Sequence, residues 1–153
     1  IAGGDTDGES PTEEHGTERD RLRHIARECG VEDAAHFPGR ISDERFLELL
    51  GACDLMVYPS RLEGFGLPVL EAMQAGLPVV ASNRTSVPEI VGDAGIMVDP
   101  DDTNALASAI ERVLTDDQLR SSLVEAGYKR GRQFSWETAA QETLNVLRRA
   151  ANA

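Results

Sequence analysis

Two glutamates and two glycines lie within one short stretch and have the chemistry to bind a sugar linked to a diphosphate. Glu63 and Glu71 lie at the two ends of the stretch, and Gly64 and Gly66 lie between them. Glycines let backbone N–H groups approach a ligand, and at the start of a helix such groups favour phosphate or electronegative sugar oxygens. The two carboxylates can accept hydrogen bonds from hydroxyls. These residues therefore predict a pocket for a ligand that combines a diphosphate with several hydroxyls, such as a nucleotide sugar.

The same spacing has a second interpretation. Glu63 could be a solvated loop residue and Glu71 an ordinary exposed residue of a helix, because glutamate is mostly found on protein surfaces. Spacing alone favours neither interpretation.

The elements around this stretch predict that the glycines lie between a strand and a helix. Residues 55–58 form an uninterrupted apolar run that ends at Pro59, as expected of a parallel strand covered on both faces. Pro68 suits the first turn of the next helix, and Gly76 suits its C-terminal cap. The loop therefore follows the carboxyl end of a strand, where parallel sheets bind ligands.

Strand and helix patterns alternate along the rest of the chain. Helices are expected at 18–29, after a Ser42 cap, at 88–91, from 103 onward and after Ser135, and strands at 35–37, 79–81 and 96–98. This alternation predicts a doubly wound, Rossmann-like α/β fold with a parallel sheet.

The length of 153 residues is that of one domain, so we expect a single domain over 1–153. Residues 3–17 are rich in Gly, Asp, Thr, Ser and Glu, a composition that predicts a mobile loop. The chain opens on Ile1-Ala2-Gly3-Gly4, which resembles the end of a buried strand. We therefore expect a fragment that lacks its first strand or strands.

Composition excludes several classes of function. The net charge of −12 argues against a nucleic-acid partner, because binding nucleic acid needs a basic surface. No apolar run is long enough to span a bilayer. Cys29 and Cys53 lack the spacing of metal ligands, so we expect no metal site, and we expect two buried, reduced thiols in a cytoplasmic protein rather than a disulfide.

The stretch from Glu63 to Glu71, with residues 72–81 after it, resembles the E-x7-E signature of family-4 retaining glycosyltransferases with the GT-B fold, which belong to the glycosyl transferases of group 1. Further similar segments are found in order along the chain, at 1–4, 37–41, 54–60, 87–91 and 99–101. The resemblance implies that this is the C-terminal, donor-binding half of a hexosyltransferase whose N-terminal, acceptor-binding domain is missing.

The resemblance also implies roles for single residues. Glu63 would be the catalytic residue that contacts hydroxyls of the donor sugar, and Glu71 would hold the ribose hydroxyls. The backbone amides that contact sugar and diphosphate would be those of Gly64, Phe65, Gly66 and Leu67. The residues that bind the base would be Gly39, Arg40 and Ile41.

The implied reaction transfers a sugar with retained configuration, assisted by the donor's own phosphate, without cofactor or obligatory metal. The Arg and Lys that usually clamp the diphosphate would precede Ile1, so we expect the fragment to bind donor but barely transfer it. Arg61 is a candidate replacement, and a solvated arginine is the alternative. Residues 83–89 lack the paired glycines that many members carry before Pro-Glu. Peripheral membrane contact through the missing half stays open.

Two other functions remain as alternatives. One is a non-catalytic nucleotide-binding module on the same scaffold, against which the intact glutamates and glycines argue. The other is a nucleotide-sugar epimerase, which needs side-chain acid and base groups near the sugar ring, and the motif loops contain no histidine.

Overall fold

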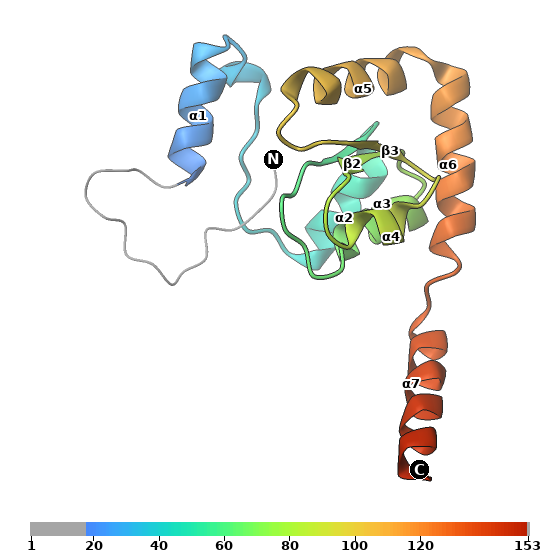
Figure 1. Ribbon diagram of the computed structural model, residues 1–153. Coiled ribbons are helices and arrows are strands. Elements are labelled where there is room, and N and C mark those ends of the chain that lie inside the picture. Colours follow the sequence, from blue (N-terminus) through green and yellow to red (C-terminus); the bar gives the residue numbers. More distant parts are fainter. Residues whose placement is uncertain (1–17, 153) are drawn as a thin grey trace. The chain divides into compact units, whose positions relative to one another are not determined.

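The computed structural model describes residues 18–152 (Figure 1). The chain forms two compact units, residues 1–48 and residues 49–153. The loop predicted at 3–17 and the strand end predicted at 1–4 lie outside the described residues. The single domain predicted over 1–153 stays a prediction.

The first unit contains helix α1 (Glu18–Glu28), a single 3-10 turn η1 (Glu32–Ala34) and the start of helix α2 (Asp43–Ala52). Helix α1 confirms the prediction for 18–29. Ser42 begins α2 as predicted: its hydroxyl accepts a hydrogen bond from Arg45 N at 3.3 Å, and its carbonyl accepts one from Phe46 N at 2.9 Å. Capping serines satisfy N–H groups that have no partner inside the helix.

The strand predicted at 35–37 is wrong. These residues have no regular secondary structure. The carbonyl of Phe37 accepts a hydrogen bond from the side chain of Arg19, and the Arg23 guanidinium lies 5.9 Å from the centre of the Phe37 ring. Side chains of α1 thus take the place of a neighbouring strand.

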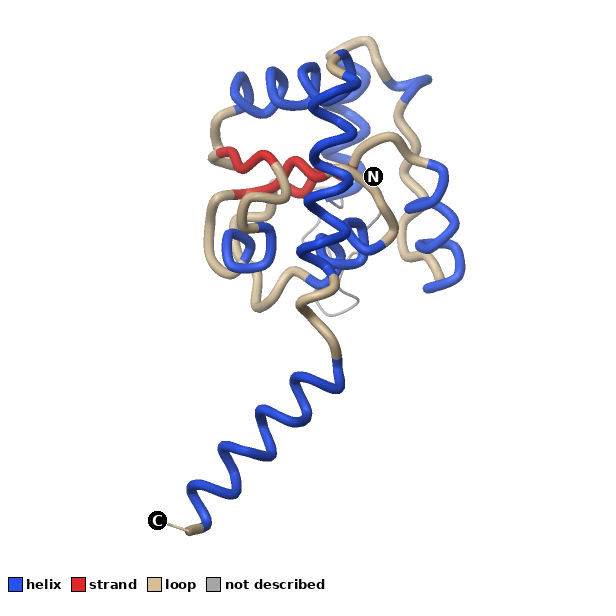
Figure 2. The backbone as a smooth tube through the Cα atoms, turned by 90° about the vertical axis from the view of Figure 1, so that its right-hand side faces the viewer, coloured by secondary structure: helices blue, strands red, loops and turns tan. Residues whose placement is uncertain are grey.

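The second unit contains a parallel three-stranded sheet in the order β1 (Met56–Tyr58), β2 (Val79–Ser82), β3 (Ile96–Val98). Figure 2 draws its strands in red. Val80 of the central strand is opposite Val57 on one side and Ile96 on the other. All of β2 is buried, whereas β1 is partly exposed because it lies at the edge of the described sheet. The strand predicted at 55–58 is therefore present as β1, but it is only partly buried. The strand that is fully buried is β2.

Helices lie on both faces of this sheet (Figure 1). Helices α3 (Leu67–Gln74) and α4 (Val87–Val91) lie on one side, and α5 (Thr103–Thr115) lies on the other. Helix α6 (Asp117–Gly131) packs against α3 and α5, and α7 (Trp136–Ala151) follows it. The core cluster between β2, β3, α5 and α6 is formed by Val80, Val98, Ala109, Val113 and Leu123. This is the predicted doubly wound, Rossmann-like architecture.

Polar side chains begin three of these helices. Asp102, Asp116 and Ser135 accept hydrogen bonds from the first turns of α5, α6 and α7 at 2.9, 2.9 and 3.1 Å. The Ser135 cap confirms its prediction. These caps fix where each helix begins and hence where the loops before α5 and α7 end.

The two cysteines differ from expectation in their burial. Cys29 and Cys53 are free thiols, but both are exposed, since they lie just beyond the ends of α1 and α2. Within residues 18–152, no group of three His, Cys, Asp or Glu side chains could hold a metal ion. No helix in that range is long and apolar enough to cross a membrane.

Close packing of α4 against β2 predicts a stability effect. A Cβ added at Gly95 would lie 2.9 Å from both the Val79 carbonyl oxygen and Val91 Cγ1. We therefore expect Gly95→Ala to lower the free energy of unfolding by about 1–3 kcal/mol, as overpacked core substitutions do. Urea unfolding of the chain, followed by circular dichroism, measures this change.

Gly51→Ala is the matched control, because an added Cβ there meets nothing within 4 Å. It should leave the free energy of unfolding unchanged or raise it slightly, since alanine favours helix over glycine. Equal unfolding midpoints for the two variants would contradict the close packing at Gly95.

Candidate functional site

The carboxylate of Glu63 is held at the carboxyl end of β1. The hydroxyl of Tyr58, the last residue of that strand, donates a hydrogen bond to Glu63 Oε1 at 2.6 Å. No other described residue forms a hydrogen bond or ion pair with the Glu63 carboxylate, so its second oxygen can accept from a ligand. Burial first, and then the hydrogen bond and charge of Glu63, raise the pKa of Tyr58 well above its usual value. Tyr58 therefore remains a neutral donor at physiological pH.

The backbone of Glu63 is held from the neighbouring loop. Glu63 N donates to Thr85 Oγ1 at 3.2 Å, and Ser86 Oγ donates to the Glu63 carbonyl at 3.1 Å. Thr85 has a φ of 56°, which is unusual for a residue other than glycine and unfavourable for a β-branched one. The turn after β2 thus holds the loop after β1 on both sides of Glu63.

The next four residues leave their backbone N–H groups unpaired. Among residues 18–152, no acceptor receives a hydrogen bond from the N–H of Gly64, Phe65, Gly66 or Leu67. Gly66 has a φ of 101°, a conformation that other residues rarely adopt, and begins α3 without a side-chain cap. These N–H groups and the positive end of the α3 dipole can therefore bind an anion.

The side chain of Phe65 is anchored beyond α6. Its ring meets that of Phe134 edge-on, with centroids 6.3 Å apart, and the Arg130 guanidinium lies 5.0 Å from the Phe134 centroid. Arg130 also donates to the carbonyl of Ile90 at 3.0 Å. The loop that carries the unpaired N–H groups is thus fixed by its aromatic side chain to the segment after α6, and Arg130 connects that segment to α4.

Glu71 lies inside α3, and its side chain is exposed. No side-chain partner of Glu71 is found among residues 18–152. Exposure suits both a ligand contact and an ordinary surface residue, so the predicted role of Glu71 stays a prediction.

The residues predicted to bind a base belong to the first unit. Gly39 has a φ of 71°, Arg40 is exposed and Ile41 is partly buried. Because they lie in the other unit, their place at the same site stays a prediction.

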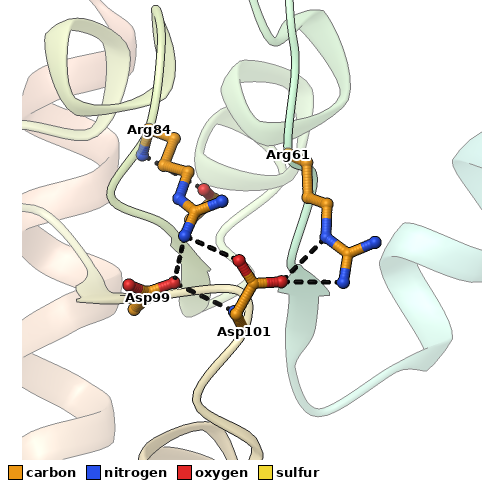
Figure 3. A network of polar contacts seen from close by, with 5 residues as sticks. Arg61, Arg84, Asp99 and Asp101 are labelled. Atoms are coloured by element: carbon orange, nitrogen blue, oxygen red, sulfur yellow. Dashed lines mark hydrogen bonds and ion pairs between the residues drawn. The ribbon is translucent and has the colours of Figure 1, made fainter.

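Charged side chains connect the loops at this edge of the sheet (Figure 3). Arg61, which the sequence offered as a diphosphate clamp, pairs with Asp101 through Nη2 at 2.7 Å and Nε at 2.8 Å. Arg84 pairs with the same carboxylate at 2.7 Å and with Asp99 at 2.8 Å. Asp99 and Asp101 lie in the loop after β3.

Sequence reasoning missed the groups that hold Glu63, which are Tyr58, Thr85 and Ser86. It also assigned no role to Arg84 or Asp101, which connect the loops nearby. The contact between Glu63 and Thr85 joins residues 22 positions apart, and the contact between Arg61 and Asp101 joins residues 40 positions apart. No local spacing indicates such contacts. The available signal was topological, since these residues end or follow strands of one parallel sheet.

Comparisons with known proteins identify relatives of the chain. Residues 1–130 match the family model described as Glycosyl transferases group 1. The O-antigen chain mannosyltransferase B of Escherichia coli is 42% identical over 133 residues, which are 87% of this chain and 35% of that protein.

Two solved structures have the same fold as this chain. Sucrose-phosphate synthase from Thermosynechococcus elongatus matches with a TM-score of 0.83 at 33% identity, over 99% of this chain and 38% of that chain. Anabaena HepE in complex with UDP-glucose matches with a TM-score of 0.81 at 27% identity, over 95% of this chain and 39% of that chain. The chain therefore spans little more than a third of the length of these relatives.

The contact between Tyr58 and Glu63 predicts a measurable titration. In a Tyr128→Phe variant, which leaves Tyr58 as the one tyrosine, phenolate absorbance should develop above the value of about 10 that is usual for tyrosine. Glu63→Gln in that background should lower the pKa of Tyr58, because the negative charge that opposes ionisation is gone. The pKa should stay above the usual value, because burial is the larger cause.

The same shift links stability to pH. A raised pKa in the folded state gives stability that is present below the unfolded-state value of about 10 and is lost as the pH rises through the folded-state value.

Identical Tyr58 titrations with and without Glu63→Gln would show that the side chains of Tyr58 and Glu63 do not interact.

Proposed function

Because the chain belongs to the glycosyl transferases of group 1 and has the Rossmann-like C-terminal half of the GT-B fold, we propose that it binds the donor in an enzyme that transfers a hexose from a nucleotide-diphosphate sugar, with retention of configuration. The UDP-glucose complex of HepE supports a nucleotide sugar as donor, and the mannosyltransferase relative supports the transfer of a hexose. The acceptor would be bound by a part of the protein outside this chain.

One observation carries the proposal. A carboxylate with one unpaired oxygen is next to four unpaired backbone N–H groups at the start of α3. Glu63 can accept hydrogen bonds from sugar hydroxyls, and the N–H groups of Gly64, Phe65, Gly66 and Leu67 can donate to the sugar and the diphosphate. Such a ligand carries hydroxyl donors at one end and anionic acceptors at the other.

The same groups would act during the reaction. Breaking the bond between sugar and diphosphate leaves additional negative charge on the diphosphate. Backbone N–H groups that already point at that position stabilise the charge without reorganising, which is the main way that enzymes stabilise anionic leaving groups. Phe65 keeps this loop in place through Phe134. We expect this chemistry to need neither a cofactor nor an obligatory metal.

The remaining residues would bind the nucleotide. Glu71 is exposed on α3 and would accept hydrogen bonds from the ribose hydroxyls. Gly39, Arg40 and Ile41 would contact the base.

Binding measurements test the nucleotide site. Isothermal titration of the chain with UDP and with GDP should detect weak binding of at least one nucleotide. Glu71→Gln should weaken it by about tenfold or more, because hydrogen bonds to a charged group contribute about 1.5–3 kcal/mol. Glu111→Gln, which changes an exposed glutamate of α5 in the same way, should leave the affinity unchanged. The absence of heat with both nucleotides would contradict the proposal.

Transfer measurements on the full-length protein test Glu63. Glu63→Gln should lower kcat by about tenfold or more, because the amide accepts hydrogen bonds from sugar hydroxyls less strongly than the carboxylate does. The affinity for UDP or GDP alone should not change, since neither carries the sugar. If the Glu63→Gln variant transfers sugar at the wild-type rate, Glu63 is not a catalytic residue.

A further inference from the structure

Four charged side chains join the loops that follow all three strands (Figure 3). Asp101 is the centre of this network. One of its oxygens, Oδ1, receives Arg61 at 2.7 Å, and the other, Oδ2, receives Arg84 at 2.7 Å. Asp99 Oδ1 receives Arg84 at 2.8 Å and the backbone N–H of Asp101 at 3.0 Å. A single carboxylate therefore bridges the loop after β1 and the loop after β2.

These two loops are the ones that hold Glu63. Arg61 precedes Glu63 by two residues, and Arg84 directly precedes Thr85. Thr85 and its neighbour Ser86 bind the backbone of Glu63 from the opposite loop, at 3.2 and 3.1 Å. Asp101 therefore joins the same two loops between which the backbone of Glu63 is held.

The turn at Thr85 requires such support. Its φ of 56° costs free energy in a threonine, because it is a sparsely populated conformation for a β-branched residue. Such a conformation persists only when surrounding contacts impose it. On the N-terminal side of Thr85, Asn83 N donates to the Val98 carbonyl at 2.9 Å, and Arg84 N donates to the buried Ser82 hydroxyl at 3.1 Å. The side chain of Arg84, directly before Thr85, adds the ion pair with Asp101.

The network is too exposed to contribute much to global stability. The side chains of Arg61 and Asp101 are 75% and 45% exposed, and exposed ion pairs compete with water. Asp101 is charged at neutral pH, as an ordinary carboxyl is, and hydrogen bonds first from Arg61 and then from Arg84 lower its pKa further. A variant of Asp101 should therefore fold normally and reveal effects on loop position.

We infer that Asp101 is a positioning residue for the donor site: by joining Arg61 to Arg84 it holds Glu63 between Tyr58 and the Thr85-Ser86 turn. This inference rests on the proposed role of Glu63 in transfer. In this role Asp101 acts through the position of Glu63 and not through a contact of its own with the donor.

Kinetics of the full-length protein test the inference, with UDP-glucose and GDP-mannose as donor probes. Asp101→Asn keeps the shape of the side chain but removes its charge and turns an N–H group toward one arginine. We expect kcat to fall by about tenfold, since small displacements of a catalytic group have large effects on rate. Affinity for UDP or GDP alone should change by less than about twofold. Asp101→Glu, which restores the charge, should recover most of the lost rate.

Asp117→Asn is the matched control. Asp117 pairs with Arg120 at 2.7 Å on the surface of α6, away from the strand ends, so this variant removes one ion pair of the same kind. It should keep the wild-type kcat. A rate loss as large in Asp117→Asn as in Asp101→Asn would overturn the inference, and so would a fall in nucleotide affinity that matches the fall in kcat.

A readout independent of activity follows the position of Glu63. In the Tyr128→Phe background, Asp101→Asn should lower the pKa of Tyr58 toward its value in Glu63→Gln, because Glu63 is no longer held beside the phenol. Asp117→Asn should not change it. An unchanged Tyr58 titration in Asp101→Asn would overturn the inference whether or not the enzyme turns over either donor.

The two readouts separate the inference from the proposed function. If Asp101→Asn moves the Tyr58 titration while Glu63→Gln and Asp101→Asn both transfer at wild-type rates, Asp101 positions Glu63 but the catalytic role of Glu63 fails. If Glu63→Gln is impaired and Asp101→Asn is normal in both readouts, the role of Glu63 stands and the positioning role of Asp101 fails.

Discussion

Parallel pairing of the three strands is the constraint on which the candidate site depends. Because β1, β2 and β3 run in the same direction, their carboxyl ends lie at one edge of the sheet, and the three following loops meet there. This edge brings Arg61 into contact with Asp101, 40 positions later, and Arg84 into contact with Asp99, 15 positions later. An antiparallel arrangement of neighbouring strands would send successive loops to opposite edges.

At this edge some polar groups of the backbone have hydrogen-bond partners and others have none. Both backbone groups of Glu63 have side-chain partners, Thr85 and Ser86, so this residue has little freedom to move. The N–H groups of the next four residues have no acceptor among residues 18–152, and one of those residues, Gly66, is buried. Buried N–H groups without an acceptor cost free energy, which a bound anion would offset. A fixed carboxylate beside unpaired N–H groups is the arrangement that a sugar diphosphate complements.

Local patterns predicted most of the fold and singled out the candidate residues of the site, but long-range contacts could not be predicted. Pro68 and the apolar runs before and after it indicated a strand, a helix and another strand, because those signals depend on neighbouring residues. The strand expected at 35–37 failed because a strand needs a partner, and the Phe37 carbonyl has a side chain of α1 instead. Glu63 was recognisable from its motif. Thr85 and Asp101 were not, since their roles exist only once the sheet has formed.

The support around Glu63 has an inner and an outer part with different energetics. The Ser82 hydroxyl is fully buried and receives the Arg84 N–H, so one end of the turn is fixed to the core of the sheet. The ion pairs of Asp101 lie outside, where water competes with every partner. Burial of the core stabilises the strands and contributes large free energies. If Asp101 positions Glu63 as inferred, these exposed ion pairs favour one arrangement of the loops among several that differ by small free energies. Stability and loop position can therefore be changed separately in this site.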